Sequence, residues 1–131
     1  MKAIILAITL MLGMTSFSQT DGFLLGRLSN VTVATYNNDH VLVDDYSIEA
    51  NATWVYDTTN QVLVFTEKTL DNKTLLNRKE EEVLSVQVED DYSIVQVKDK
   101  NNDIYDYFFW FNGKKVAYMS KDGYVIMNAI N

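Results

Sequence analysis

The chain has few residues whose types and spacing suit catalysis. His40 is its only histidine, and it contains no cysteine. A Ser-His-Asp arrangement would have to use His40, with Asp39 and Asp44 nearby in the sequence. The sequence contains no Gly-x-Ser-x-Gly segment, the turn that exposes a nucleophilic serine in many hydrolases. His40 follows an Asn/Asp-rich stretch that favours a turn, so we interpret it as a surface turn histidine. A single histidine leaves only carboxylates for a zinc site, and we therefore expect no metal centre and no cofactor.

Two acidic doublets, Asp44-Asp45 and Asp90-Asp91, are the other candidates for catalysis. An acid-catalysed glycoside hydrolase needs two carboxylates roughly 5–10 Å apart across a cleft. No sequence feature brings the doublets together, and Asp is a common turn former. We interpret both doublets as links between strands, and we rank a hydrolase behind a binding role.

The segment from Asp99 to Asp103 matches the first half of a calcium-binding loop, D-x-N-x-D. The sixth position of that loop is Ile104 instead of Gly, and the twelfth is Trp110 instead of Glu. We expect a polar hairpin loop held by Asx-type hydrogen bonds, with weak calcium binding as an open alternative.

Aromatic residues near the C-terminus suggest binding chemistry. Asp106 lies in the row Ile104, Asp106, Phe108, Trp110, so that a carboxylate sits among apolar neighbours. A buried carboxylate must be paired or protonated. Asp106 is thus either a polar anchor in a ligand cavity or a rim residue that reaches water. We predict a ligand-binding set made of Asp106, Phe108, Trp110 and Met119.

Four tyrosines are assigned to the opposite face of the same strands. A buried tyrosine hydroxyl needs a hydrogen-bond partner, and aromatic residues are enriched at protein interfaces. We predict a half-wet interface made of Tyr105, Tyr107, Tyr118 and Tyr124.

The elements that must position these residues are short strands. They are rich in Val, Ile, Tyr, Phe and Thr and are separated by Asn, Asp and Gly about every ten residues, which favours antiparallel pairing over βαβ units. We predict an all-β, antiparallel single domain of about eight to ten short strands, a small barrel or strongly curved meander, with a β-sandwich as the alternative. The expected strands are Val31–Tyr36, His40–Asp44, Tyr46–Glu49, Ala52–Tyr56, Val62–Thr66, Val83–Glu89, Ser93–Lys98, Ile104–Phe111, Lys115–Ser120 and Tyr124–Met127.

Two segments fit this pattern less well. Residues 19–27 are expected to form an irregular segment that precedes the first strand. Within Leu70–Glu82 the apolar residues do not recur with helical spacing beyond one turn. We expect the start of a strand at Lys73–Asn77 followed by a charged loop over residues 78–82, with a short helix as the alternative.

The C-terminal third predicts a three-stranded meander. Asn112-Gly113 predicts a two-residue hairpin turn in which both residues have positive φ. That turn pairs Phe109 with Val116, Tyr107 with Tyr118, Phe108 with Ala117 and Asp106 with Met119. Lys121-Asp122-Gly123 predicts a three-residue loop with an αL glycine, which places Tyr118 near Ile126 and Ala117 near Met127. Both faces of this meander are apolar, so one must face the core and the other must be covered.

The N-terminus predicts export. Residues 1–18 have the form of a signal peptide, with a positive charge at Lys2, an apolar stretch over residues 3–12 and a Ser16-Phe17-Ser18 cleavage site before Gln19. The apolar stretch is about half the roughly 20 residues of a membrane span, and no lipid-anchor cysteine follows it. We expect a secreted or periplasmic protein with one domain over residues 19–131 and no transmembrane segment.

Charge and composition limit the partners. The chain has 11 Lys and Arg against 18 Asp and Glu, and loss of Lys2 with the leader lowers the net charge from −7 to −8. This charge argues against nucleic acid and anionic lipid, and it permits a cation or a basic protein. We expect a non-catalytic binding module for a small apolar or carbohydrate ligand. The alternative is a protein–protein interaction module, such as an inhibitor, an envelope subunit or a homodimer.

Overall fold

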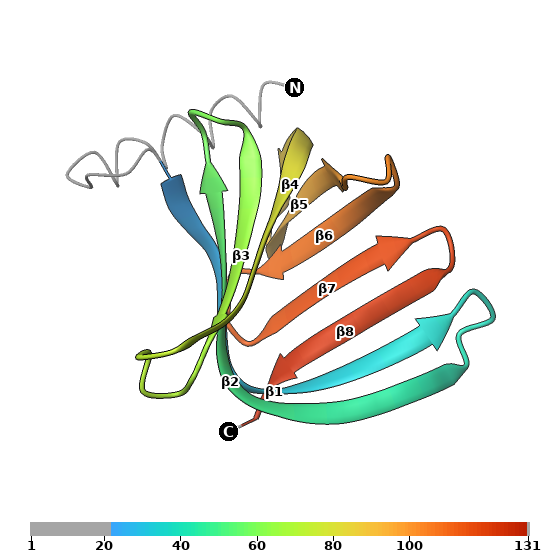
Figure 1. The fold of residues 1–131 in the computed structure, drawn as a ribbon. Coiled ribbons are helices and arrows are strands. Elements are labelled where there is room, and N and C mark those ends of the chain that lie inside the picture. The colour runs from blue at the N-terminus through green and yellow to red at the C-terminus, as the bar shows by residue number, and fades with distance from the viewer. Residues whose placement is uncertain (1–21, 131) are drawn as a thin grey trace.

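Eight antiparallel strands form a closed barrel (Figure 1). The computed structural model describes residues 22–130, so the predicted signal peptide over residues 1–18 lies outside the described residues. Each strand pairs with the next one along the chain, and the last pairs with the first. The strands are β1 (Gly22–Asn37), β2 (Leu42–Asp57), β3 (Val62–Lys68), β4 (Leu75–Val88), β5 (Tyr92–Lys98), β6 (Ile104–Trp110), β7 (Lys115–Ser120) and β8 (Gly123–Ala129). The predicted all-β barrel is therefore confirmed, and no described residue belongs to a helix that could cross a membrane.

The first two strands are 16 residues long and bend around the barrel. β1 starts at Gly22, so the expected irregular segment is wrong over residues 22–27, while residues 19–21 lie outside the described residues. β2 contains two of the expected short strands and the end of a third. The polar breaks that suggested separate strands lie at bulges or inside β2. One shift in the β1–β2 register falls between Ser29 and Val31, where Asn30 has a φ of 53°. A bulge of this kind bends a strand without ending it.

Gly26 allows the bent β1 to pass close to the core. A Cβ atom at this position would lie 2.8 Å from Cδ1 of Phe109 and 3.2 Å from Cγ2 of Val116. Any side chain would force those residues to move, so the path of β1 over the core depends on glycine here.

The charged segment at residues 78–82 is part of β4 and forms neither a loop nor a helix. Strand alternation sends Lys79 and Glu81 to the same face, since they pair with Phe65 and Leu63 of β3. That face is the inside of the barrel, because Leu63 is fully buried. The expected charged loop is thus wrong, because the charged side chains of this segment point alternately into the barrel and out to solvent along β4.

The predicted β6–β7 register is confirmed at all four pairs. The turn itself differs, because the loop covers residues 111–114 and only Gly113 has positive φ, at 73°. Its N–H donates to the carbonyl of Trp110 at 3.2 Å.

The β7–β8 loop is one residue shorter than predicted. Ser120 pairs directly with Gly123, whose φ is 145° and where a Cβ atom would lie 2.0 Å from the carbonyl oxygen of Tyr36. Tyr118 therefore pairs with Val125 instead of lying near Ile126. This shift moves Tyr124 to the face opposite Tyr118, because neighbouring residues alternate.

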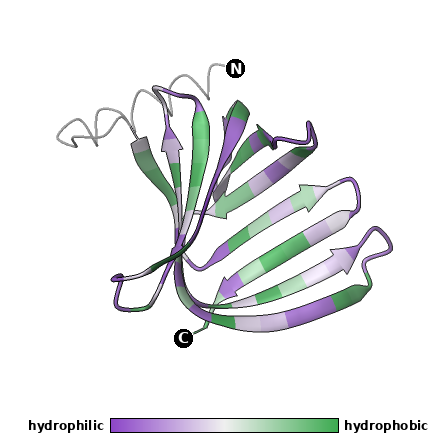
Figure 2. Ribbon diagram, viewed as in Figure 1, coloured by the Kyte–Doolittle hydropathy of each residue, from purple (hydrophilic) through white to green (hydrophobic). Residues whose placement is uncertain are grey.

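One part of the barrel interior is closely packed. Figure 2 shows hydrophobic and hydrophilic residues alternating along the strands, as expected for a sheet with one face in a core. The largest fully buried side chains are Trp54, Phe109, Leu28, Leu63, Val95, Val97 and Val116.

Candidate functional site

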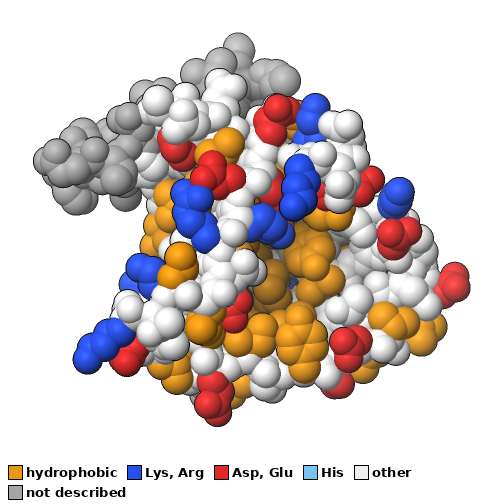
Figure 3. Space-filling model, viewed as in Figure 1, with side chains coloured by type: hydrophobic (Ala, Val, Ile, Leu, Met, Phe, Trp, Pro, Cys, Tyr) orange, Lys and Arg blue, Asp and Glu red, His pale blue; other side chains and the backbone are white. Residues whose placement is uncertain are grey.

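The strand pairing leaves the barrel interior open on one side. β3 pairs with β2 from Asn51 onward, and β5 pairs with β4 from Glu82 onward. The first half of β2 and the first half of β4 therefore each have an edge that bonds to no neighbouring strand. Figure 3 shows hydrophobic side chains at the bottom of a hollow on this side, bordered by charged side chains.

Two adjoining cavities, of about 360 and 270 Å³, make up this opening. They share Lys79, Tyr107, Tyr118 and Val125, and we call them together the inner hollow. Its other principal lining residues are Val33, Thr35, Tyr46, Ile48, Trp54, Phe65, Glu67, Asn77, Tyr105, Asp122 and Met127.

Aromatic rings form much of the wall of the inner hollow. Tyr118 lies between Tyr105 and Tyr107, with ring centroids 6.0 and 5.3 Å away. Trp54 and Phe65 contact each other deeper in the barrel at 5.2 Å. Rings at these separations interact favourably with one another and offer both faces and edges to a guest molecule.

A buried carboxylate, that of Glu81, contacts two residues that line the hollow, Lys79 and Tyr107. Glu81 is only 4 % exposed. Its Oε1 accepts a hydrogen bond from the hydroxyl of Tyr107 at 3.1 Å and lies 3.5 Å from Nζ of Lys79. A buried charge is tolerated when it is both hydrogen-bonded and paired, and Glu81 meets both conditions.

The tyrosine hydroxyls of the hollow keep their protons. Burial raises the pKa of Tyr107 far above its usual value, and the negative charge of Glu81 adds to the effect. Burial also raises the pKa of Tyr118 and of Tyr105, and the charge of Asp99 contributes at Tyr105. These hydroxyls are therefore neutral hydrogen-bond donors well into the alkaline range.

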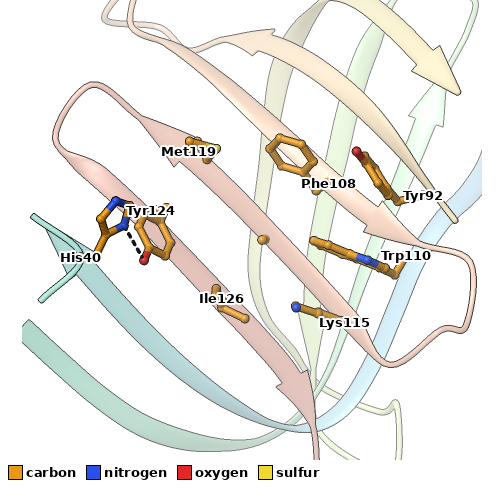
Figure 4. A pocket seen from close by; sticks show the side chains of 9 residues that line it. His40, Tyr92, Phe108, Trp110, Lys115, Met119, Tyr124 and Ile126 are labelled. Carbon is orange, nitrogen blue, oxygen red and sulfur yellow. Dashed lines mark hydrogen bonds between the residues drawn. The ribbon is translucent and has the colours of Figure 1, made fainter. Parts of the chain in front are cut away.

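A second apolar groove of about 370 Å³ lies on the outer face of β5–β8, and we call it the outer groove. Figure 4 shows its side chains projecting from these strands. The ring of Trp110 lies 5.4 Å from that of Tyr92, and Nζ of Lys115 lies 4.6 Å from the centre of the Trp110 ring. The complete lining is His40, Tyr92, Phe108, Trp110, Lys115, Ala117, Met119, Tyr124 and Ile126.

The predicted ligand-binding residues are found on the outer face and not inside the barrel. Phe108, Trp110 and Met119 line the outer groove. Asp106 is half-buried on that face and accepts a hydrogen bond from Nε2 of Gln96 at 3.2 Å. The sequence does not decide between the two faces, because both faces of the sheet are apolar and alternation alone does not say which one faces inward.

The four predicted interface tyrosines are divided between the two sites. Tyr105, Tyr107 and Tyr118 line the inner hollow, while Tyr124 lines the outer groove and also borders the inner hollow. Tyr124 OH lies 3.1 Å from Nδ1 of His40, an exposed residue of the β1–β2 turn, as its sequence context predicted.

The acidic turn candidates act structurally. Oδ1 of Asp99 accepts the backbone N–H groups of Asn101 at 2.8 Å and Asp103 at 3.0 Å, which confirms the predicted Asx turn. Asp90-Asp91 does link two strands, but Asp44-Asp45 lies inside β2, so that interpretation holds for one doublet only. Within residues 22–130, no group of three or more His, Asp or Glu side chains could hold a metal ion.

Sequence reasoning missed the polar part of the inner hollow. Lys79 and Glu81 stand in a run of five charged residues that suggested a solvated loop. A usable signal is present in the sequence. Lys79 and Glu81 lie four and two residues before Val83, which begins an expected strand, so extending that strand toward the N-terminus puts all three side chains on one face.

Comparisons with protein-family models, curated proteins and solved structures found no match to this chain. The geometry of the inner hollow and the outer groove therefore carries the functional argument.

Proposed function

We propose that this protein is a non-catalytic binding protein that holds a small, mostly apolar ligand in the inner hollow. The observation that carries the proposal is an aromatic cavity inside a barrel, reached from outside between two unpaired strand edges. Small-molecule sites are usually concave and largely apolar, occupy about 300–1,000 Å³ and contain a few polar groups. The larger of the two adjoining cavities, of about 360 Å³, falls in this range, and the smaller, of about 270 Å³, extends it.

The wall of the hollow favours an apolar body over a carbohydrate. Trp54, Phe65 and Ile48 contribute no charge, and the buried Glu81 is already bonded to Tyr107. A sugar placed against Trp54, Phe65 and Ile48 would leave its hydroxyls without hydrogen-bond partners, whereas an apolar body would not. With the leader predicted in residues 1–18, we place the ligand outside the cytoplasm.

The outer groove supports a second candidate, a contact with another protein. It is an apolar depression that contains Trp110 and Phe108, and aromatic residues of this type are enriched at interfaces. We rank it second because the groove lies on an open sheet face, whereas the inner hollow is enclosed by strands on several sides.

A matched pair of substitutions separates the two sites. Ile48 lines the inner hollow and Ile126 lines the outer groove, and both are half-buried. The probe is N-phenylnaphthylamine, an uncharged dye whose fluorescence increases in apolar surroundings. We expect the dye to bind the native protein, to be excluded in Ile48→Trp because the new ring fills the hollow, and to bind Ile126→Trp as before.

Circular dichroism of each variant checks that the barrel remains folded. Loss of dye binding in Ile126→Trp alone would transfer the site to the outer groove. A native protein that does not bind the dye would refute the proposed function.

A further inference from the structure

The charges around the inner hollow are unbalanced. One lysine, Lys79, lines the hollow together with the carboxylates of Glu67 and Asp122, and the buried Glu81 lies behind them, in contact with the lining residues Lys79 and Tyr107. The chain as a whole carries a net charge of −7. Carboxylates around a cavity with low-dielectric walls produce a focused negative potential, which attracts cations and repels anions.

The aromatic wall has the same preference. Tyr46, Tyr105, Tyr107 and Tyr118 surround the polar part of the hollow, and Trp54 lies deeper. The face of an aromatic ring carries partial negative charge, so it attracts an ammonium group that lies over it. Rings and carboxylates together are the chemistry that recognises an amine.

Lys79 already places an ammonium group at this position. Its Nζ lies 3.5 Å from Oε1 of Glu81, and its side chain is 49 % exposed, whereas that of Glu81 is 3 % exposed. The lysine can therefore swing into water, while the carboxylate is held in place by Tyr107. If Lys79 withdrew without a replacement, Glu81 would lose its counter-charge inside the protein, which is costly.

We infer that the ligand of the inner hollow is an amphipathic organic cation, an amine with an apolar body, whose ammonium group replaces that of Lys79 beside Glu81. The apolar body would lie against Trp54 and Phe65. This inference rests on the proposed function, and it goes further by naming the chemical class of the ligand and the two residues that select it.

Three probes with one body and different head groups test the inference. They are phenylbutylamine, phenylbutanol and phenylbutyrate, which at neutral pH are a cation, a neutral molecule and an anion. Each is titrated against the native protein by calorimetry and by displacement of N-phenylnaphthylamine. We expect the amine to bind about tenfold more tightly than the alcohol, and the carboxylate to bind most weakly.

Two variants identify the groups responsible. Glu81→Gln keeps an acceptor for Tyr107 but removes the charge, so amine affinity should fall about tenfold while alcohol affinity stays within about twofold. Lys79→Met removes the competing ammonium, so amine affinity should rise. The control is the exposed pair Glu82 and Lys98, 3.6 Å apart, because Glu82→Gln and Lys98→Met make the same charge changes outside the hollow.

The possible failures can be told apart. Tightest binding of the carboxylate, lost in Lys79→Met, would show that Lys79 anchors an anion and would overturn the inference. Equal affinities for all three probes would also overturn it, while leaving the binding function intact. If neither the dye nor any of these probes binds the native protein, the proposed function fails as well.

Discussion

The two faces of the β6–β7–β8 sheet both carry aromatic side chains and differ in how deeply these are buried. Inward-facing Tyr107 and Phe109 are 3 % and 1 % exposed, whereas Phe108 and Trp110, their neighbours on the same strand, are only half-buried. Glu81 of β4, a buried carboxylate with two partners, bonds to Tyr107 of this inner face. Both faces are thus rich in apolar side chains, and deeper burial and the bond to a buried charge distinguish the inner one.

The difference has a physical reason. On a half-exposed face a polar group can be satisfied by water, so its position is only loosely specified. Inside the barrel, Glu81 needs protein partners because unpaired burial of a charge is expensive, and those partners hold it in one geometry. A fixed charge beside a cavity can select a ligand, which explains why we assign specificity to the inner hollow and not to the outer groove.

The largest contrast between the faces should come from removing a ring on each. Phe109→Ala removes a ring that contacts Trp54 and Tyr107 in the core, with centroids 5.9 and 5.8 Å apart. We expect a loss of about 3–5 kcal/mol of unfolding free energy for this variant, and about 1 kcal/mol for Phe108→Ala on the outer face. Urea denaturation measures both values, with Phe109→Leu as a milder version of the first change.

Equal losses at Phe108 and Phe109 would contradict the comparison. They would mean that the outer groove is buried in the protein as it exists in solution, as in a homodimer, and light scattering would then show two copies.

A smaller contrast should come from two tyrosine hydroxyls. Tyr107→Phe removes the hydrogen bond to Glu81, and bonds to charged groups are worth about 1.5–3 kcal/mol. Tyr124→Phe removes only the exposed contact with His40, so we expect a change within about 0.5 kcal/mol. Thermal or urea unfolding of the two variants measures the difference. A destabilisation at Tyr124 as large as that at Tyr107 would refute the view that hydrogen bonds on the inner face contribute more to stability than those on the outer face.

Much of the fold could be predicted because local rules decide it. The β6–β7 pairs, from Phe109 with Val116 to Asp106 with Met119, follow from turn residues and strand alternation. The errors arose where tertiary contacts override local signals. Gly123 begins β8 because it passes against the backbone of Tyr36, a contact between residues far apart in the chain, and this shortened the loop by one residue.

The site was harder to predict than the fold. Phe108 and Tyr107 are adjacent and both aromatic. The two-residue period of a strand places them on opposite faces of the sheet, but it does not say which face is the core. The decision depends on how β1 and β2 close the barrel, and those long strands were predicted as short pieces. Glu81 was assigned to solvent because charges usually are, and only its bond to Tyr107, 26 residues away in the chain, explains its burial.

The smallest expected effect is a difference in alkaline stability. Burial raises the pKa of Tyr107 above the value of 10.0 that an unperturbed tyrosine has. Below pH 10 the folded and unfolded states both keep this proton. Above pH 10 only the unfolded state loses it, so the unfolding free energy falls as pH rises. We expect Tyr107→Phe to flatten this decline between about pH 10 and 11 relative to the native protein.

Urea midpoints at a series of pH values, with phenolate absorbance recorded in parallel, measure the effect. The decline should not vanish in Tyr107→Phe, because burial also raises the pKa of Tyr118. If Tyr107→Phe declined as steeply as the native protein, the hydroxyl of Tyr107 would be reachable by water in the folded state. Glu81 would then lie at an open surface, where water would screen its charge, and it could no longer select an amine over an alcohol.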